Sequence, residues 1–210
     1  GDALFSRGPA GVEVTPRFVE IDHERRMVGW DRLALAGLAV DLGVSFGDEE
    51  HLPGIDLIMP DIRFLEKERK NLMGLVLTHA HEDHFGAIID LWPKLQCPIY
   101  ATKFSAALFE AKCASERNPP KIPVTVVPSG GRVHLGPFSV EFIPVAHSIP
   151  ESHALAIHTP VGIVLHTGDW KIDPTPIIGL PTDERRLREL GDAGVLALVF
   201  AVAMTLGRAY

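Results

Sequence analysis

Four candidate metal ligands follow a short apolar run in the stretch Gly74-Leu75-Val76-Leu77-Thr78-His79-Ala80-His81-Glu82-Asp83-His84. The apolar run predicts a buried strand, and residues 85–92 predict a helix directly after the ligands. His79 and His81 lie two residues apart, so in a nearly extended segment both side chains project to the same side. Asp83 and His84 follow on the turn into the helix, and this single loop can therefore serve two adjacent metal ions. Zinc and manganese both accept nitrogen and oxygen ligands of this kind.

The alternative is a solvated polar loop whose histidines are incidental. A lone His-x-His pair would be weak evidence against it. Here the preceding strand, the ligand spacing and the following helix all agree with a metal-binding motif, and this agreement favours the metal site.

The composition is that of an ordinary globular protein. The chain has 210 residues, enough for one substantial domain, with 46% hydrophobic and 22% charged residues. A formal net charge of -7 gives no sign of a generally basic nucleic-acid-binding surface. It does not exclude nucleic acid, because a metal pair supplies concentrated positive charge where a phosphate would bind.

The two cysteines and the hydropathy pattern predict a cytoplasmic protein. Cys97 and Cys113 have neither metal-site nor disulfide spacing, and thiols of this kind fit a reducing compartment. The first 30 residues lack the apolar core and small-residue cleavage site of a signal peptide. We also expect no membrane contact, because no stretch approaches the roughly 20 apolar residues of a membrane helix.

Short strands and helices alternate along most of the chain. Residues 1–36 are the least informative part, although residues 12–21 alternate loosely and predict a strand. The other predicted strands are residues 38–43, 97–101, 124–127, 132–135, 139–144, 154–158, 162–166 and 195–200. The other predicted helices are residues 61–69 with Asp61 as N-cap, residues 103–116, and a charged helix that Thr182 or Asp183 caps and that runs through Leu190. In the helix over 103–116 the predicted apolar face comprises Phe104, Ala107, Leu108 and Ala111.

Three predicted strands, ending at Leu77, Ala146 and Leu165, are each followed by candidate ligands. His147 follows the second and Asp169 the third, which is the placement expected of an active site at one edge of a sheet. The alternatives are a strand-end histidine satisfied by its neighbours and a plain Gly168-Asp169 turn. Asp41 ends another apolar run, and it is either a carboxylate that orients a ligand histidine or a simple turn residue.

The remaining histidines have no comparable setting, and we expect most of them to be surface or strand residues. They are His23, His51, His134, His153, His158 and His166. His166 lies three residues before Asp169 and could support the site, although strand alternation would equally turn it away.

The ligand pattern, with each group placed after a strand, resembles the metallo-β-lactamase superfamily. That resemblance implies an αββα sandwich with a dinuclear metal site at its edge. More specifically, the chain resembles the ribonuclease J family, prokaryotic β-CASP ribonucleases of RNA maturation and decay. The segments that carry this resemblance are Pro53-Gly54-Ile55-Asp56-Leu57-Ile58-Met59-Pro60-Asp61, residues 78–87, Pro144-Val145-Ala146-His147-Ser148-Ile149-Pro150-Glu151-Ser152 and His166-Thr167-Gly168-Asp169-Trp170-Lys171-Ile172-Asp173.

The resemblance implies a ligand assignment and an activity. His79, His81 and His147 would hold one metal ion, Asp83 and His84 the second, and Asp169 would bridge the two. Two divalent ions, zinc first and manganese as the alternative, would make a water available as hydroxide for attack on phosphorus, with Asp83 orienting or deprotonating it. The implied substrate is RNA, cut endonucleolytically, from the 5′ end, or in both modes, by a parent protein that is a homo-oligomer and has RNA-decay partners.

The chain departs from the family pattern at both ends. We expect residues 1–36 to be a divergent segment, residues 37–199 to be the amino-terminal part of the metallo-β-lactamase domain, and residues 200–210 to be a divergent tail. We expect the chain to be a fragment that lacks the β-CASP domain and a further ligand histidine, and that self-associates through uncovered sheet surface. Two rival functions remain: a hydrolase of a small ester, thioester or lactam, and a non-catalytic fragment that binds RNA or a partner.

Overall fold

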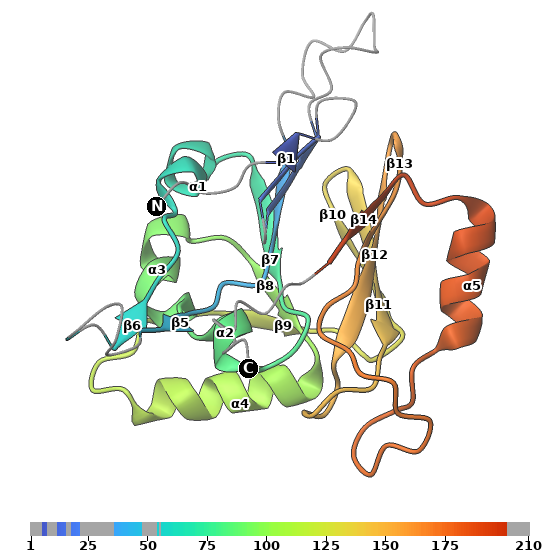
Figure 1. Cartoon of the computed structure of the whole chain (residues 1–210). Coiled ribbons are helices and arrows are strands. Elements are labelled where there is room, and N and C mark those ends of the chain that lie inside the picture. Colours follow the sequence, from blue (N-terminus) through green and yellow to red (C-terminus); the bar gives the residue numbers. More distant parts are fainter. Residues whose placement is uncertain are drawn as a thin grey trace, which may run out of the picture.

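Two β-sheets lie face to face, with helices on both outer faces (Figure 1). The computed structural model describes residues 36–47, 54 and 56–200, together with the backbones of strands at residues 6–7, 12–15 and 18–21. Helices α1 to α4 cover one sheet and α5 covers the other, so the layers follow the order helix, sheet, sheet, helix. The predicted αββα architecture is therefore confirmed.

The first sheet has seven strands in the order β1-β2-β3-β4-β7-β8-β9. The strands β4, β7, β8 and β9 pair in parallel, so their carboxyl ends lie along one edge of the sheet. The strand predicted over 12–21 is a hairpin of two strands that extends the sheet beside β4. The bounds are β1 Ser6–Arg7, β2 Val12–Thr15, β3 Phe18–Ile21, β4 Gly37–Val40, β7 Leu72–Val76, β8 Ile99–Ala101 and β9 Val124–Val126.

The second sheet has five strands in the order β10-β11-β12-β13-β14. The first three pairings are antiparallel, so β11 and β13 both run in the same direction and end at the same edge. The bounds are β10 Arg132–Leu135, β11 Phe138–Pro144, β12 His153–Thr159, β13 Gly162–His166 and β14 Ala197–Val199. A separate small ribbon pairs β5 (Ser45–Phe46) with β6 (Leu57–Ile58).

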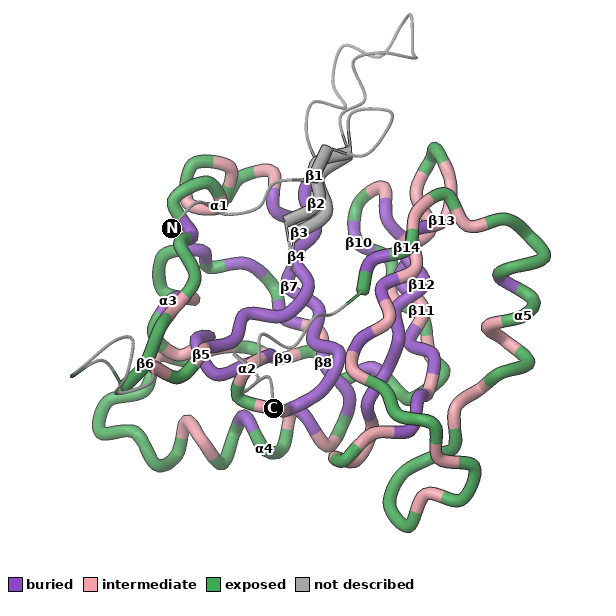
Figure 2. The backbone as a smooth tube through the Cα atoms, in the orientation of Figure 1, coloured by how far each residue is buried: buried purple, intermediate pink, exposed green. Residues whose placement is uncertain are grey.

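A buried apolar cluster fills each of the three interfaces between the four layers. Between the sheets, Val40 and Val76 of the first sheet pack in one cluster with Phe142 and Leu155 of the second. A second cluster lies under the helices of the first sheet, and a third lies beneath α5, where Leu190 is buried. Figure 2 shows the buried backbone concentrated in the facing strands, with exposed residues on the outer helices and loops. None of the described helices is long and apolar enough to cross a membrane.

The helix predicted over 85–92 is in fact two short helices, α2 (Glu82–Phe85) and α3 (Ile88–Leu95). The break occurs because the N–H of Ala87 donates to the carbonyl of Leu42, at 3.0 Å, instead of continuing the helical ladder. A contact with the loop after β4 thus ends α2 one turn after it begins. This places the two ligand-bearing residues of α2 against that loop.

Two details of the other helices also differ from prediction. Helix α1 (Arg63–Glu68) has Ile62 as its N-cap residue, while Asp61 accepts from the N–H of Arg63 and pairs with its guanidinium group. Helix α4 (Lys103–Ser115) buries Ser105 and Phe109. The predicted apolar face was wrong, since Ala107, Leu108 and Ala111 are exposed and Phe104 is only half-buried.

That difference in α4 has a packing cause. Phe109 contacts Phe85 of α2, with ring centroids 6.2 Å apart, and this contact rotates the helix away from its most apolar stripe. Helix α5 (Glu184–Ala193) continues past the predicted end at Leu190, and Asp183 of the two predicted caps is confirmed, because its side chain accepts from the N–H of Arg186 at 2.9 Å.

Candidate metal centre

The candidate ligands gather where β7, β11 and β13 end, at the edge between the two sheets. His79, His81, Asp83 and His84 come from the loop after β7 and from α2. His147 comes from the loop after β11, and Asp169 comes from the turn after β13. The predicted convergence of three strand ends is therefore observed, but on two sheets rather than one.

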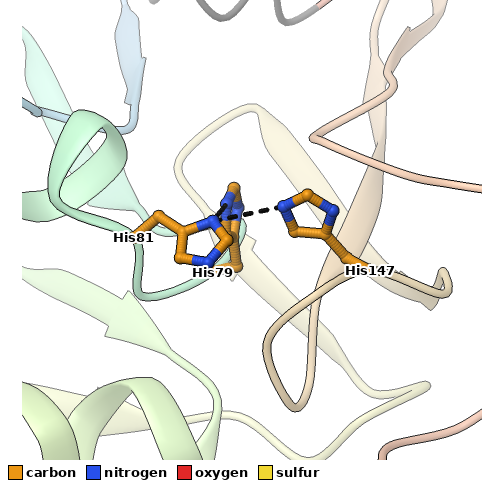
Figure 3. A group of neighbouring side chains, drawn as sticks. All are labelled: His79, His81 and His147. Atoms are coloured by element: carbon orange, nitrogen blue, oxygen red, sulfur yellow. Dashed lines mark hydrogen bonds between the residues drawn. The ribbon is translucent and has the colours of Figure 1, made fainter.

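Three imidazoles form the first group: His79, His81 and His147 (Figure 3). The Nδ1 of His81 lies 3.0 Å from the Nε2 of His79 and 3.2 Å from the Nε2 of His147. The three ring nitrogens lie within 4.8 Å of one another. Convergent imidazoles at this spacing are a typical site for a divalent transition metal.

His79, His84 and Asp169 form a second, overlapping group within the same limit. The Nε2 of His84 lies 3.3 Å from an Oδ2 oxygen of Asp169. Among the described residues, the Nε2 of His84 and the Oδ1 of Asp169 are buried atoms without a hydrogen-bond partner. Buried polar atoms are rarely left this way, and a cation between them would satisfy both. The residues present therefore fit a metal centre.

Asp41 connects this site to the strand layer beneath it. Its carboxylate accepts from the N–H of Thr78 at 2.8 Å and from the Thr78 hydroxyl at 2.7 Å. The Nδ1 of His84 lies 2.7 Å from the same carboxylate. An ionised carboxylate only accepts, so the Nδ1 of His84 carries the proton and its Nε2 faces Asp169.

Thr78 orients a second imidazole in the same way. Its hydroxyl donates to Asp41, so the oxygen accepts from the Nδ1 of His79, which lies 3.0 Å away. The Nε2 of His79 then carries a lone pair directed into the ligand group, toward the Nδ1 of His81. The sequence analysis did not single out Thr78, although a hydroxyl residue directly before a ligand histidine is a visible signal.

Burial and the neighbouring charges set the protonation of the cluster. Burial raises the pKa of Asp41, but the charge and hydrogen bond of His84, together with the charges of His79 and His166, outweigh burial and lower this pKa to about 2. Burial opposes a proton on His84, but the carboxylates of Asp41 and Asp169 raise its pKa to about 10. Burial, followed by the charge of His84, lowers the pKa of His79 to about 3. The carboxylates that favour a proton on His84 would equally favour a metal cation.

Asp83 lies at the rim of the cluster and belongs to neither ligand group. Its Oδ2 is 3.6 Å from the Nε2 of His84, and its side chain is 36% exposed. Asp83 is therefore near enough to face the second group and open enough to contact water.

Two glycines allow close approaches that the site depends on. A Cβ on Gly43 would lie 1.9 Å from the carbonyl oxygen of Asp83. Gly168 has a φ of +57°, and a Cβ there would lie 2.4 Å from the carbonyl oxygen of His153. Both positions therefore require glycine, the first because the loop after β4 touches α2 and the second because of its left-handed backbone.

The other histidines are a mixed set. His153 and His166 are fully buried, and His166 accepts at Nδ1 from the N–H of Gly168, so it supports the turn that carries Asp169. His134 is exposed and His158 is half-buried. His23 and His51 lie outside the described residues.

The comparisons with known proteins agree with this fold and site. A family model of the metallo-beta-lactamase superfamily matches residues 40–192, and the chain belongs to that superfamily. A crystal structure of a protein of unknown function from Enterococcus faecalis has a TM-score of 0.52 at 19% identity, covering 80% of this chain and 43% of that one. It supports the fold alone.

Among curated proteins, the chain is similar to ribonuclease J of Sinorhizobium meliloti, with 54% identity over 162 residues. It is also 43% identical over 190 residues to ribonuclease J of Mycolicibacterium smegmatis. These matches cover 77% and 89% of this chain, but only 28% and 33% of the relatives. The resemblance to the ribonuclease J family is confirmed, and the chain spans about a third of those relatives.

Proposed function

We propose that this chain carries the metal-binding part of a ribonuclease that hydrolyses RNA phosphodiester bonds. The observation that carries the proposal is the pair of overlapping ligand groups, built from five residues in a chain similar to ribonuclease J. RNA as the substrate, and endonucleolytic or 5′-to-3′ cleavage, belong to this proposal. So do cytoplasmic location, a homo-oligomeric parent protein and partners in RNA decay.

In this proposal His79, His81 and His147 would hold one divalent ion, Asp83 and His84 would hold a second, and Asp169 would serve both. Zinc is the first candidate because imidazole ligands predominate, and manganese is the alternative. Bound at this position, the ions would supply Lewis acidity toward phosphate oxygens and toward water. His84 is also held by Asp41, which fixes the direction of its Nε2.

Asp83 has a second proposed role, as the group that accepts a proton from the attacking water at Oδ2. Its exposure and its 3.6 Å distance from His84 support that role. A carboxylate at the rim can contact both water and a ligand histidine. The buried Asp41 cannot, since its oxygens are engaged with Thr78 and His84.

The test begins with metal content per purified chain, measured by mass spectrometry without chelator. We expect two equivalents, falling to one or none in His79→Ala because His79 is shared by both ligand groups. Cleavage of a 5′-labelled RNA should then depend on added metal and be lost in His79→Ala. If the wild-type chain contains no metal and does not bind added zinc or manganese, the proposal is overturned.

The same samples separate the rival hydrolases. A chromogenic lactam and a thioester are assayed beside the RNA at equal enzyme concentration. Turnover of either small substrate at a higher kcat/KM than RNA would assign the site to another reaction of the superfamily. Metal binding with no turnover of any of them would favour the non-catalytic alternative.

A further inference from the structure

A carboxylate from the loop between β11 and β12 caps a helix of the first layer close to the metal centre. The Oε2 of Glu151 accepts from the backbone N–H of Phe104 at 2.8 Å, over a separation of 47 residues. Phe104 is the second residue of α4, where N–H groups have no partner within the helix. The N-cap residue of α4, Thr102, makes no side-chain cap to the helix backbone. Glu151 therefore supplies the cap that α4 lacks.

Glu151 belongs to the loop that carries His147. The base of this loop is closed by a bond from the N–H of Val145 to the carbonyl of Ser152, at 3.0 Å. Between these two residues only His147 points into the ligand group, and it does so with its side chain 16% exposed. The bond from Glu151 to α4 therefore fixes the carboxyl-terminal end of this loop, next to its base, against the opposite layer.

The backbone of Glu151 is itself specialised for this contact. Its φ is +55°, a left-handed conformation that residues other than glycine rarely adopt. The Nδ1 of His153 lies 2.7 Å from the Glu151 carbonyl oxygen, and the N–H of His153 donates to the carbonyl of Thr78. The turn is thus held from both layers, and the unfavourable conformation aims the carboxylate at α4.

The strand order explains why this contact reaches the metal centre. Strand β8 lies beside β7 in parallel, so the amino end of α4 begins next to the loop that carries His79 and His81. A bond from Glu151 to α4 therefore sets the spacing between His147 and the other two imidazoles. Residues that hydrogen-bond a metal ligand directly commonly change metal affinity by about 10- to 100-fold when they are removed, so the lower end of that range is expected for a residue that acts through the backbone.

We propose that Glu151 is a positioning residue for the metal centre, which ties the loop of His147 to α4 and holds the three-imidazole group at binding distance. Glu151 contacts no ligand atom and belongs to neither ligand group. The inference rests on the proposed metal centre and adds a residue that acts on it through the backbone.

The test is a cobalt(II) titration of the full 210-residue chain, followed by visible absorption, which reports ligand number and geometry as well as affinity. We expect Glu151→Ala to weaken cobalt binding about tenfold and to change the absorption bands, because His147 is no longer held. Glu151→Gln should restore both, since its amide oxygen still accepts from Phe104. That rescue separates the hydrogen bond from the charge.

Asp183→Ala is the matched control, because it removes a capping carboxylate from α5 but keeps the backbone bond from the N–H of Asp183 to the carbonyl of Pro144, beside the loop of His147. It should lower thermal stability without changing cobalt affinity. Unchanged affinity in Glu151→Ala, or an equal loss in Asp183→Ala, would overturn the inference while leaving the metal centre intact. No cobalt binding by wild type would overturn the metal centre and the inference together.

A second measurement does not depend on metal or on the folding of the alanine variant. Amide hydrogen exchange in the metal-free wild-type chain should show Phe104 protected relative to Lys103, the first residue of the same helix. Exchange at Phe104 as fast as at Lys103 would show that the cap is absent, and would overturn the inference.

Discussion

The two halves of the candidate metal centre are held in different ways. The half from the seven-stranded sheet is buried and bonded through side chains: Thr78, His79, His84 and Asp41 are each at most 3% exposed. The half from the five-stranded sheet is more open, since the side chains of His147 and Asp169 are 16% and 15% exposed. Its loops are held mainly by backbone bonds, such as that from Lys171 to Ala146.

This difference indicates that the first half is held mainly by its own buried side-chain bonds. The second half depends on backbone bonds and on contacts across the layers. A buried side-chain network tolerates the loss of a member poorly, because the remaining partners lose their bonds in a low-dielectric setting. A loop held by backbone bonds keeps those bonds when a side chain is removed. Substitutions in the two halves should therefore have unequal effects on stability.

The largest expected effect is from Asp41→Ala in the metal-free chain. It leaves the buried Thr78 and His84 without their shared acceptor, and we expect a loss of about 3–5 kcal/mol in the free energy of unfolding. Part of the loss is backbone strain, since Asp41 has a φ of +59°. Urea unfolding monitored by circular dichroism measures it.

Asp169→Ala is the control in the other half, where we expect a smaller loss of about 1–2 kcal/mol, because its carboxylate is partly open and faces His84, while Ser152 bonds to its backbone carbonyl. Asp41→Asn retains a residue that tolerates the left-handed backbone, so it separates strain from the lost charge. Equal losses in Asp41→Ala and Asp169→Ala would show that the two halves are held alike.

The two halves are joined where the backbone N–H of His153 donates to the carbonyl of Thr78. Burial lowers the pKa of His153 to about 4, against 6.5 when the chain is unfolded. Between pH 4 and pH 6.5 the imidazole of His153 binds a proton in the unfolded chain but not in the folded one. The free energy of unfolding therefore decreases as the pH falls from 6.5 to 4. The full loss from this group is about 3 kcal/mol at most.

Urea unfolding at pH 7 and at pH 4.5 tests this, in wild type and in His153→Leu. The variant is expected to be less stable at pH 7, since Ser129 and Glu151 lose their bonds to the imidazole, but to depend less on pH. An equal pH dependence in both proteins would assign the acid sensitivity to other groups.

The sequence predicted the candidate ligands better than it predicted the contacts around them. His79, His81 and His84 follow from local spacing, and His147 and Asp169 follow from their places after strands. Asp41 could not be assigned, because its contact with His84 depends on β4 lying beside β7, which no local pattern specifies. The burial of Phe109 in α4 has the same origin, as it follows from where α2 lies.

The smallest expected effect is at the outer rim of the buried half. The Nζ of Lys112 in α4 lies 2.5 Å from the Oε2 of Glu82 in α2 and 5.1 Å from the ring centroid of Phe85. The two charged side chains are 26% and 46% exposed, so water screens their attraction. We expect Lys112→Met to cost about 0.5–1 kcal/mol in stability, measured by urea unfolding.

Lys121→Met is the matched control, since it removes the same charge from an exposed loop position and should change stability by less. The cost of Lys112→Met should also shrink in high salt, because screening weakens an exposed pair. A salt-independent loss above about 2 kcal/mol would show that α2 is held from its outer side by α4. In that case Asp41 would not be the main support of the first half. Lys112 would also stabilise α2, the helix that carries Asp83 and His84, from its opposite side.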